Sequence, residues 1–536
     1  MEIKIKKDTL ILALLGFAVF VIYIFTAPPS IYAGRSGEIA AAAYSWGAPD
    51  SMGFSLYPIL GKLFSYLIPF GEFALKLNIF SAFLGASAVS VLFLIFRKLR
   101  IEYWAAFAAA LSAAFSRAIW SHSNIAGARP LSALLFVLAI LFFLHWLGAK
   151  EKKHFFSHRA LLWGILAAAC LLAAGAQMFW GEAAVQSPSI LYVLKESIKS
   201  LANEFTFFGL PFLLLGMLVT FKRSRGWFFA GLGAILLTLL LPMVFKNNIF
   251  YEYYWPAVIM LSVFLAFGLD AAAGYLKNSL KIQPLFAWFI ISLLPVFVFG
   301  AHLSDLNRRD YVLLQKTADI ILESLPKNSI FITESDTLAS ALLYRQSVLG
   351  ERSDLTSING KSFSRSRYRE EKKIELKAKG KMYADNFFDL AVLNKEGGVF
   401  LAHASFPDLE KNYKLLPAGL VYRVADKNGK EDAASIIKSN AKFWQAPDFT
   451  FLMDAKLDKE ILNKELIGLY IMGLNNIGAY FVKTGNMDYV KEGIAYFEKS
   501  LEIRENGSAL QTLAKIYSAL GELEKAQEYE RRYQGL

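Results

Sequence analysis

Long apolar stretches fill the first 302 residues of the chain, and mixed polar and charged sequence fills the remainder. A helix needs about 20 mostly apolar residues to cross the hydrocarbon of a bilayer, and by that measure the pattern predicts about nine spans. The apolar stretch 54–70 is interrupted by Gly and Pro, which favours a re-entrant or interfacial helix. The fold class is therefore a polytopic α-helical membrane protein. The predicted spans are 9–27, 72–96, 102–118, 130–148, 160–179, 205–221, 227–245, 254–276 and 284–302.

Basic residues between the apolar stretches predict the orientation, because cytoplasmic loops of membrane proteins are enriched in Lys and Arg. With a cytoplasmic N-terminus, every predicted cytoplasmic segment is basic, and the odd number of spans places the C-terminal part outside the cytoplasm. The net charge of +12 then reflects membrane orientation and does not indicate a nucleic-acid partner. We expect a multi-pass protein of the plasma (inner) membrane. The cytoplasmic segments are 1–8, 97–101, 149–159, 222–226 and 277–283.

The polar part of the chain has two patterns. Residues 303–436 alternate helix and strand signals, which predicts a small extracytoplasmic α/β domain after the transmembrane domain 1–302. Residues 437–536 are wholly helical, and two segments about 36 residues apart are alike, near the tetratricopeptide period of roughly 34. This region is either a partner-binding groove or a C-terminal cap. The expected helices are 311–325 and 336–346, and the expected strands are 329–333, 355–358, 390–393, 399–402 and 420–424.

The loop after the first span holds the first candidate for chemistry. Ser36 can cap a short helix that runs to about Trp46, with Glu38 in its first turn. Glu38 then has two interpretations. It stabilises the helix N-terminus, or it is a base at the membrane surface.

Short motifs recur in order along the chain, and together they resemble a known family. They are Ser36-Gly37-Glu38, Gly53 to Tyr57, Leu77 to Ala82, Trp180-Gly181-Glu182, Tyr254 to Pro256 and Gly419 to Arg423. They resemble the family catalogued as domain of unknown function 2723, which contains protein O-mannosyltransferases with a GT-C membrane fold. The resemblance covers roughly residues 5–425 and implies a polyprenyl-phosphate sugar donor with chemistry on the outer face.

The resemblance implies specific roles. An outer-loop carboxylate takes the proton of an acceptor hydroxyl, and a cation balances the leaving phosphate. Glu38 and Asp50 are the candidate catalytic residues, with Arg129 or Lys246 as the phosphate clamp. No metal-ligand spacing or phosphate-cradling glycine loop is present in the sequence, so no cofactor is predicted and the lipid-linked sugar is a substrate. The candidate substrate-binding residues are Arg35, Arg129, His122, Glu182, Lys246 and Tyr254.

One departure from the family leaves two functions open. The family pattern reads Asp-x-Gly-Glu, and Arg35 stands at the aspartate position. An arginine cannot be deprotonated in a protein, so it cannot act as a base. Either Glu38 or Asp50 serves a membrane glycosyltransferase acting on an extracytoplasmic protein or glycan, or the chain is an inactive relative. An inactive relative would be a scaffold in an envelope or surface-assembly complex and would bind a protein partner through its helical repeat.

Overall fold

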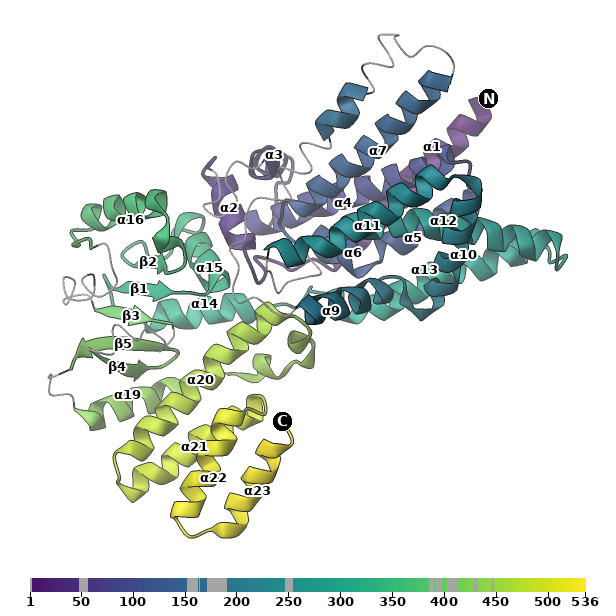
Figure 1. Cartoon of the computed structure of the whole chain (residues 1–536). Coiled ribbons are helices and arrows are strands. Elements are labelled where there is room, and N and C mark those ends of the chain that lie inside the picture. The colour runs from purple at the N-terminus through teal and green to yellow at the C-terminus, as the bar shows by residue number, and fades with distance from the viewer. Residues whose placement is uncertain are drawn as a thin grey trace. The chain divides into compact units, whose positions relative to one another are not determined.

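The structure, a computed structural model, divides into two compact units, and each is described separately (Figure 1). The membrane unit comprises Met1–Tyr32 and Ile39–Tyr311, and the C-terminal unit comprises Ala33–Glu38 and Val312–Leu536. The segment Ala33–Glu38 therefore belongs to the C-terminal unit although it lies near the start of the chain. The described residues are 2–47, 56–151, 162, 164–170, 190–245, 254–384, 390, 398–402, 413–427, 432–445 and 448–536.

The membrane unit is built from helices. Five of them are long and apolar enough to cross a bilayer among the residues that the structure describes: α4, α10, α12, α13 and, in α7, the segment Arg129–Leu147. The prediction of a multi-pass helical membrane protein is confirmed. The helices are α1 (Glu2–Phe25), α2 (Ser36–Tyr44), α3 (Leu56–Ser65), α4 (Phe73–Lys98), α5 (Tyr103–Ala114), α6 (Arg117–Ser123), α7 (Arg129–Glu151), α9 (Ile190–Asn203), α10 (Thr206–Arg223), α11 (Arg225–Phe245), α12 (Trp255–Asn278) and α13 (Pro284–Leu306).

The predicted number of nine spans is not supported. The predicted span 102–118 is wrong, because α5 has 12 residues and covers only about 18 Å of a hydrocarbon layer of about 30 Å. The chain leaves the helix at Phe115, Ser116 has extended backbone angles, and α6 begins at Arg117. The described apolar parts of α1 and α11, Leu10–Phe25 and Arg225–Thr238, leave the predicted spans 9–27 and 227–245 untested. Most of 160–179 lies outside the described residues.

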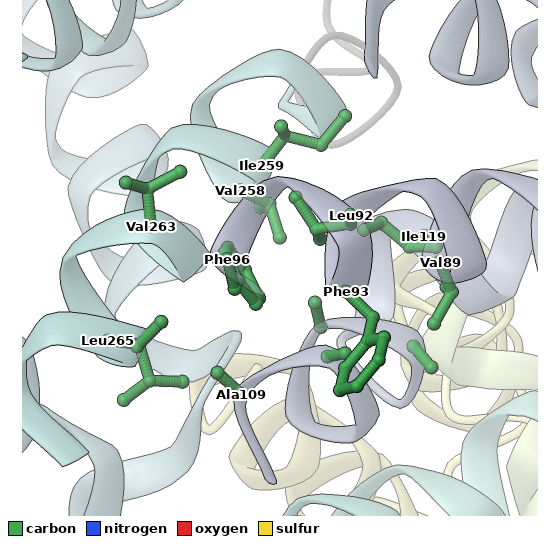
Figure 2. Packing of buried hydrophobic residues seen from close by; sticks show 14 of the residues in the cluster. Val89, Leu92, Phe93, Phe96, Ala109, Ile119, Val258, Ile259, Val263 and Leu265 are labelled. Atoms are coloured by element: carbon green, nitrogen blue, oxygen red, sulfur yellow. The ribbon is translucent and has the colours of Figure 1, made fainter. Parts of the chain in front are cut away.

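The core of the membrane unit forms where α4, α5 and α12 meet (Figure 2). Phe93 and Phe96 of α4 are fully buried, and they share one hydrophobic cluster with Ala109 of α5 and Leu265 of α12. One face of α5 consists of buried alanines. In a bilayer the lipid tails are as apolar as the side chains, so helices associate through close packing, which small residues permit.

The C-terminal unit contains a five-stranded sheet with the strand order β2-β1-β3-β5-β4. The central strand β1 is parallel to both β2 and β3, while β5 is antiparallel to β3 and β4. Buried aliphatic and aromatic side chains, including Ile332, Ile358 and Leu401, form its core. The strands are β1 (Ile330–Thr333), β2 (Thr356–Asn359), β3 (Val399–Leu401), β4 (Tyr413–Ala418) and β5 (Val421–Asp426).

Helices make up the rest of this unit, and four of them, α20 to α23, follow one another at the C-terminal end (Figure 1). Successive helices of this group pack together. A hydrogen bond of 2.9 Å between the hydroxyls of Thr317 and Tyr470 joins α14 to α20. The helices are α14 (Leu313–Ser324), α15 (Asp336–Ser347), α16 (Ser366–Ala378), α19 (Ala433–Gln445), α20 (Ile461–Lys483), α21 (Met487–Ile503), α22 (Gly507–Ala519) and α23 (Leu523–Gln534), with short 3-10 turns at Ser362–Ser364, Thr450–Met453 and Ala455–Lys459.

Most predicted elements of this unit are confirmed within a few residues of their expected ends. The strand expected at 390–393 is not: Leu390, its one described residue, is helical. The strand β4 (Tyr413–Ala418) was not predicted from the sequence. β4 lies at the edge of the sheet and pairs with only one neighbour. Its residues therefore need not alternate strictly between polar and apolar types, and Pro417 is tolerated.

Two glycines bring α10 and α12 into backbone contact. A Cβ atom on Gly216 would lie 1.8 Å from the carbonyl oxygen of Phe264, and one on Gly268 would lie 1.8 Å from that of Phe212. Both distances are far inside van der Waals contact, and the obstructing atoms are backbone, so a side chain at either position would separate the helices.

We predict that Gly268→Ala destabilises the membrane unit by about 1–3 kcal/mol, the usual cost of overpacking. Thermal unfolding of the detergent-solubilised protein measures this change. Gly274→Ala is the matched control, since nothing lies within 4 Å of its added Cβ on the same helix. Because alanine has a higher helix propensity than glycine, Gly274→Ala should be neutral or slightly stabilising. Equal melting temperatures for Gly268→Ala and the wild type would contradict the described contact.

Candidate functional site

A pocket opens in the membrane unit between α4, α6, α7 and α12. It encloses about 400 Å³, including its part open to solvent. Its lining is almost wholly apolar, with Val89 and Leu92 from α4, Ile119 from α6 and Ile259 from α12, all of which Figure 2 labels. Polar groups enter the lining at one place, where His122 and Ser123 of α6 meet Arg129 at the start of α7. The pocket is thus an almost wholly apolar chamber that has one arginine and one histidine among its lining residues.

A glycine of α4 sets the approach of α6 to the pocket. A Cβ atom on Gly85 would lie 2.2 Å from the Oγ atom of Ser123. Only glycine at this position lets α6 lie directly against α4, and this close approach places His122 in the pocket lining.

His122 is buried, and its Nε2 atom has no hydrogen-bond partner among the described residues. Burial, together with the charges of Arg129 and Arg308, holds the pKa of His122 well below its usual value. The ring is therefore neutral at physiological pH. A neutral imidazole can still donate or accept one hydrogen bond at this nitrogen.

Arg308, just after α13, was not anticipated from the sequence. Its guanidinium donates to the carbonyl oxygen of Ser121 at 2.6 Å and to the Oδ1 atom of Asn124 at 2.8 Å. The same group lies 4.3 Å from the centre of the Tyr32 ring. Because Arg308 is buried and charged, it raises the positive potential felt at His122. The sequence signal was the pair Arg308-Arg309, which follows the apolar stretch 284–302 after five residues.

Glu204, between α9 and α10, is a second group that the sequence analysis did not select. Its Oε2 atom accepts a hydrogen bond of 2.9 Å from the backbone N–H of Ala118, in the first turn of α6. Its Oε1 atom is buried without a hydrogen-bond partner among the described residues. Burial raises the pKa of Glu204 to about 7, although the Ala118 bond and the charge of Arg117 act in the opposite direction. Glu204 therefore supports the helix that carries His122.

The candidate residues Arg35 and Glu38 lie in the C-terminal unit. Arg35 forms an ion pair of 3.2 Å with Asp336 of α15. The backbone N–H of Glu38 donates to the Oγ atom of Ser340 at 2.8 Å. The long loop after the first span thus contacts α15, about 300 residues later in the chain.

The remaining candidate residues lie in the pocket lining, in the hydrophobic core or outside the described residues. His122 and Arg129 both line the pocket in the membrane unit. Tyr254 is fully buried in the hydrophobic core directly before α12, and its neighbour Trp255 lines the pocket. Asp50, Glu182 and Lys246 lie outside the described residues. Within the described ranges, no group of three or more His, Cys, Asp or Glu side chains is arranged to hold a metal ion.

Comparison with known proteins gives a likeness to one family over the N-terminal part. Residues 36–199 match the family described as Protein O-mannosyl-transferase TMEM260 N-terminal domain. The chain is 31% identical over 139 residues to Protein O-mannosyl-transferase TMEM260 of Mus musculus. The aligned residues make up 25% of this chain and 20% of the relative. It is 28% identical over 121 residues to Protein O-mannosyl-transferase tmem260 of Dictyostelium discoideum, which covers 22% of this chain and 15% of the relative.

The expected likeness to protein O-mannosyltransferases is confirmed for this part of the chain. The matches span a fifth or less of the length of these relatives. The matched residues 36–199 include Glu38, His122 and Arg129.

We predict that Glu204 makes the stability of the membrane unit depend on pH. Its folded pKa of about 7 exceeds the ordinary 4.5, so folding binds a proton and stability falls as pH rises from about 4.5 through 7. The loss approaches roughly 3 kcal/mol, since one pKa unit corresponds to about 1.4 kcal/mol. Glu204→Gln keeps the shape without the charge.

The melting temperature of the detergent-solubilised protein, measured from pH 5 to pH 8, tests this prediction. It should fall more steeply in the wild type than in Glu204→Gln. The exposed Glu323 of α14 offers a matched control, because Glu323→Gln should retain the wild-type slope. Parallel curves for the wild type and Glu204→Gln would show that Glu204 does not titrate as described.

Proposed function

We propose that this chain is a membrane glycosyltransferase that transfers a sugar from a polyprenyl-phosphate donor to a hydroxyl of an extracytoplasmic protein or glycan. Two findings support the proposal: the likeness of residues 36–199 to protein O-mannosyltransferases, and the pocket of the membrane unit. The observation that carries it is an apolar pocket with Arg129 among its lining residues. A polyprenyl phosphate has the matching construction, an anionic head on an apolar chain.

The surroundings of His122 suit a phosphate for electrostatic reasons. Arg129 and Arg308 both act on His122 with positive charge. A phosphate bound there would be stabilised by these charges in a region of low dielectric constant, where charge interactions are stronger than in water. The apolar lining on α4 and α12 would receive the first units of the lipid. Arg129, at the start of α7, is our candidate for the direct phosphate contact.

The proposed reaction is a displacement at the anomeric carbon of the sugar. The carboxylate of Glu38, or alternatively of Asp50, takes the proton of the acceptor hydroxyl. The acceptor oxygen forms a bond to the anomeric carbon while the bond from that carbon to the phosphate oxygen breaks. Polyprenyl phosphate leaves with the bonding electron pair, and Arg129 balances its charge. Arg35, His122, Glu182, Lys246 and Tyr254 stay as candidates for substrate contacts.

The finer assignments belong to the same proposal. We assign the membrane unit to the GT-C type and the chain to the domain of unknown function 2723 family, and we interpret α20 to α23 as a diverged tetratricopeptide-like repeat. The basic loops support a cytoplasmic N-terminus and an extracytoplasmic C-terminal unit in the plasma membrane of a cell with a surface envelope.

The second candidate function is a catalytically inactive scaffold in an envelope-assembly complex. One observation favours it: Arg35, which stands where the family has an aspartate, is ion-paired with Asp336. A scaffold would bind a protein partner through α20 to α23 and would transfer no sugar.

We predict that Glu38→Gln lowers the turnover number at least 100-fold, because general-base catalysis contributes about 10²–10⁴. The assay uses the purified protein in lipid vesicles with polyprenyl-phosphate-linked mannose and a serine- and threonine-rich acceptor peptide. Glu323→Gln, at an exposed position, is the control and should retain activity. Equal turnover by Glu38→Gln and the wild type would remove Glu38 from the mechanism, and no transfer by the wild type with any polyprenyl-phosphate sugar would favour the scaffold.

The proposed role of Arg129 as the phosphate contact is tested by removing or keeping its charge. Arg129→Ala should lower kcat/KM for the donor by about 100-fold, in line with the loss of a charged hydrogen bond, whose value is about 1.5–3 kcal/mol. Arg129→Lys keeps the charge without the forked donors and should recover part of the activity. If Arg129→Ala transfers sugar as well as the wild type at low donor concentration, the phosphate clamp is elsewhere.

A further inference from the structure

The segment Ala33–Glu38 is held along one face of α15. Besides the Arg35–Asp336 ion pair, the backbone N–H of Gly34 donates to the Oγ1 atom of Thr337 at 3.1 Å. Together with Ser340, which accepts from Glu38, the three contacting residues of α15 occupy positions 336, 337 and 340. Residues three and four apart lie on the same face of a helix, so these contacts form one continuous surface.

Two glycines make this close approach possible. Gly34 has φ +95°, a conformation that side chains rarely adopt. A Cβ atom on Gly37 would lie 2.4 Å from the carbonyl oxygen of Ser340 and 2.9 Å from its carbonyl carbon. Because these obstructing atoms are backbone, they cannot turn aside as a side chain would. Any larger residue at 37 must push the segment away from α15.

The contact with Ser340 also completes the start of α2. The first backbone N–H groups of a helix have no partner within the helix and need an outside acceptor. Glu38 is the third residue of α2 (Ser36–Tyr44), and its N–H finds this acceptor in the Ser340 hydroxyl. Ser340 therefore fixes the backbone that carries the Glu38 side chain, and the side-chain carboxylate takes no part in this bond.

A second contact orients the carboxylate of Asp336 for its ion pair with Arg35. Its Oδ1 atom accepts a hydrogen bond of 2.9 Å from Asn359, the last residue of β2. Burial alone would raise the pKa of Asp336, but the charges of Arg35 and Lys361 and the Asn359 hydrogen bond together lower it below its usual value. Asp336 is thus ionised at neutral pH, and one of its oxygens is already oriented by the sheet.

The contact of Ala33–Glu38 with α15, called the clamp from here on, lies at the carboxyl ends of two parallel strands. Asp336 follows the carboxyl end of β1, and Asn359 ends the parallel neighbour β2. In sheets of this kind, the carboxyl ends of parallel strands are where ligands bind, next to helix N-termini. Here the chain's own segment Ala33–Glu38 contacts this edge.

We infer that Asp336 and Ser340 are positioning residues, which hold the segment Ala33–Glu38 on α15 and thereby fix Glu38 for the transfer reaction. This inference rests on the proposed function, because it gives Glu38 its role as base. The C-terminal unit then acts on catalysis through α15.

The experiment measures the clamp and the reaction separately on the full-length protein in lipid nanodiscs. Backbone hydrogen exchange of the peptide covering residues 33–44 reports the clamp without any substrate. Sugar transfer from polyprenyl-phosphate mannose reports kcat and KM. The variants are Ser340→Ala, Asp336→Asn, Arg35→Gln, the double variant Arg35→Gln/Asp336→Asn, and Gly37→Ala. Glu334→Gln, an exposed carboxylate two residues before Asp336, is the matched control.

Ser340→Ala should raise exchange at Glu38 and lower kcat by about five- to tenfold, near the value of one lost hydrogen bond, with KM for the donor changed by less than about twofold. The double variant should be no worse than the poorer single variant, because the two residues act as one pair. Gly37→Ala should raise exchange most. Glu334→Gln should match the wild type in both measurements.

The possible failures are distinguishable. Unchanged exchange in Ser340→Ala and Gly37→Ala would overturn the clamp itself, whatever the activity. Increased exchange with unchanged kcat would overturn the positioning role and leave the proposed function standing. No transfer by the wild type would overturn the proposed function and the positioning role together, and the exchange data would still decide whether the clamp exists.

Discussion

The bend between α5 and α6 must satisfy its backbone polar groups inside an apolar helix bundle, and the membrane unit depends on how it does so. Unpaired polar groups in such surroundings cost several kcal/mol each. Tyr23 of α1 meets this need by donating from its hydroxyl to the carbonyl oxygen of Ala114, while the Nδ1 atom of His302 in α13 bonds the carbonyl oxygen of Phe115. Just after the bend, the backbone N–H of Ala118 donates to the Oε2 atom of Glu204. These bonds fix the bend between the first and last membrane helices.

This arrangement has an electrostatic consequence for the pocket. Arg308 is held at the C-terminal end of α6, where it donates to the carbonyl oxygen of Ser121 and to Asn124, and its charge adds to that of Arg129 near the neutral ring of His122. The same region is apolar on its other sides. The positive charge that folding places beside His122 is thus available to an anionic ligand with an apolar chain, which links the end of α6 to the proposed donor.

The sequence predicted the features that depend on local pattern. Long apolar stretches such as that of α4, and the buried strand Ile330–Thr333, were recognisable because burial imposes their periodicity. The end of α5 at Ala114 was not, since Ala and Ser continue the apolar pattern across the bend. The roles of Arg308 and Asp336 depend on partners more than 180 residues away, which no local pattern encodes. Glu38 could be selected from its motif, whereas its hydrogen bond to Ser340 could not.

The central claim is that the lipid donor binds in the pocket of the membrane unit, and photo-crosslinking tests this claim directly. A polyprenyl phosphate with a photoreactive group on its first isoprene unit would be irradiated with the protein in nanodiscs, and the labelled peptides would be identified by mass spectrometry. The account predicts labelling of α4, α6 and α12 next to the pocket, abolished by excess unlabelled polyprenyl phosphate and reduced in Arg129→Ala. Competable labelling confined to α10 and α13, whose residues are absent from the pocket lining, would contradict it.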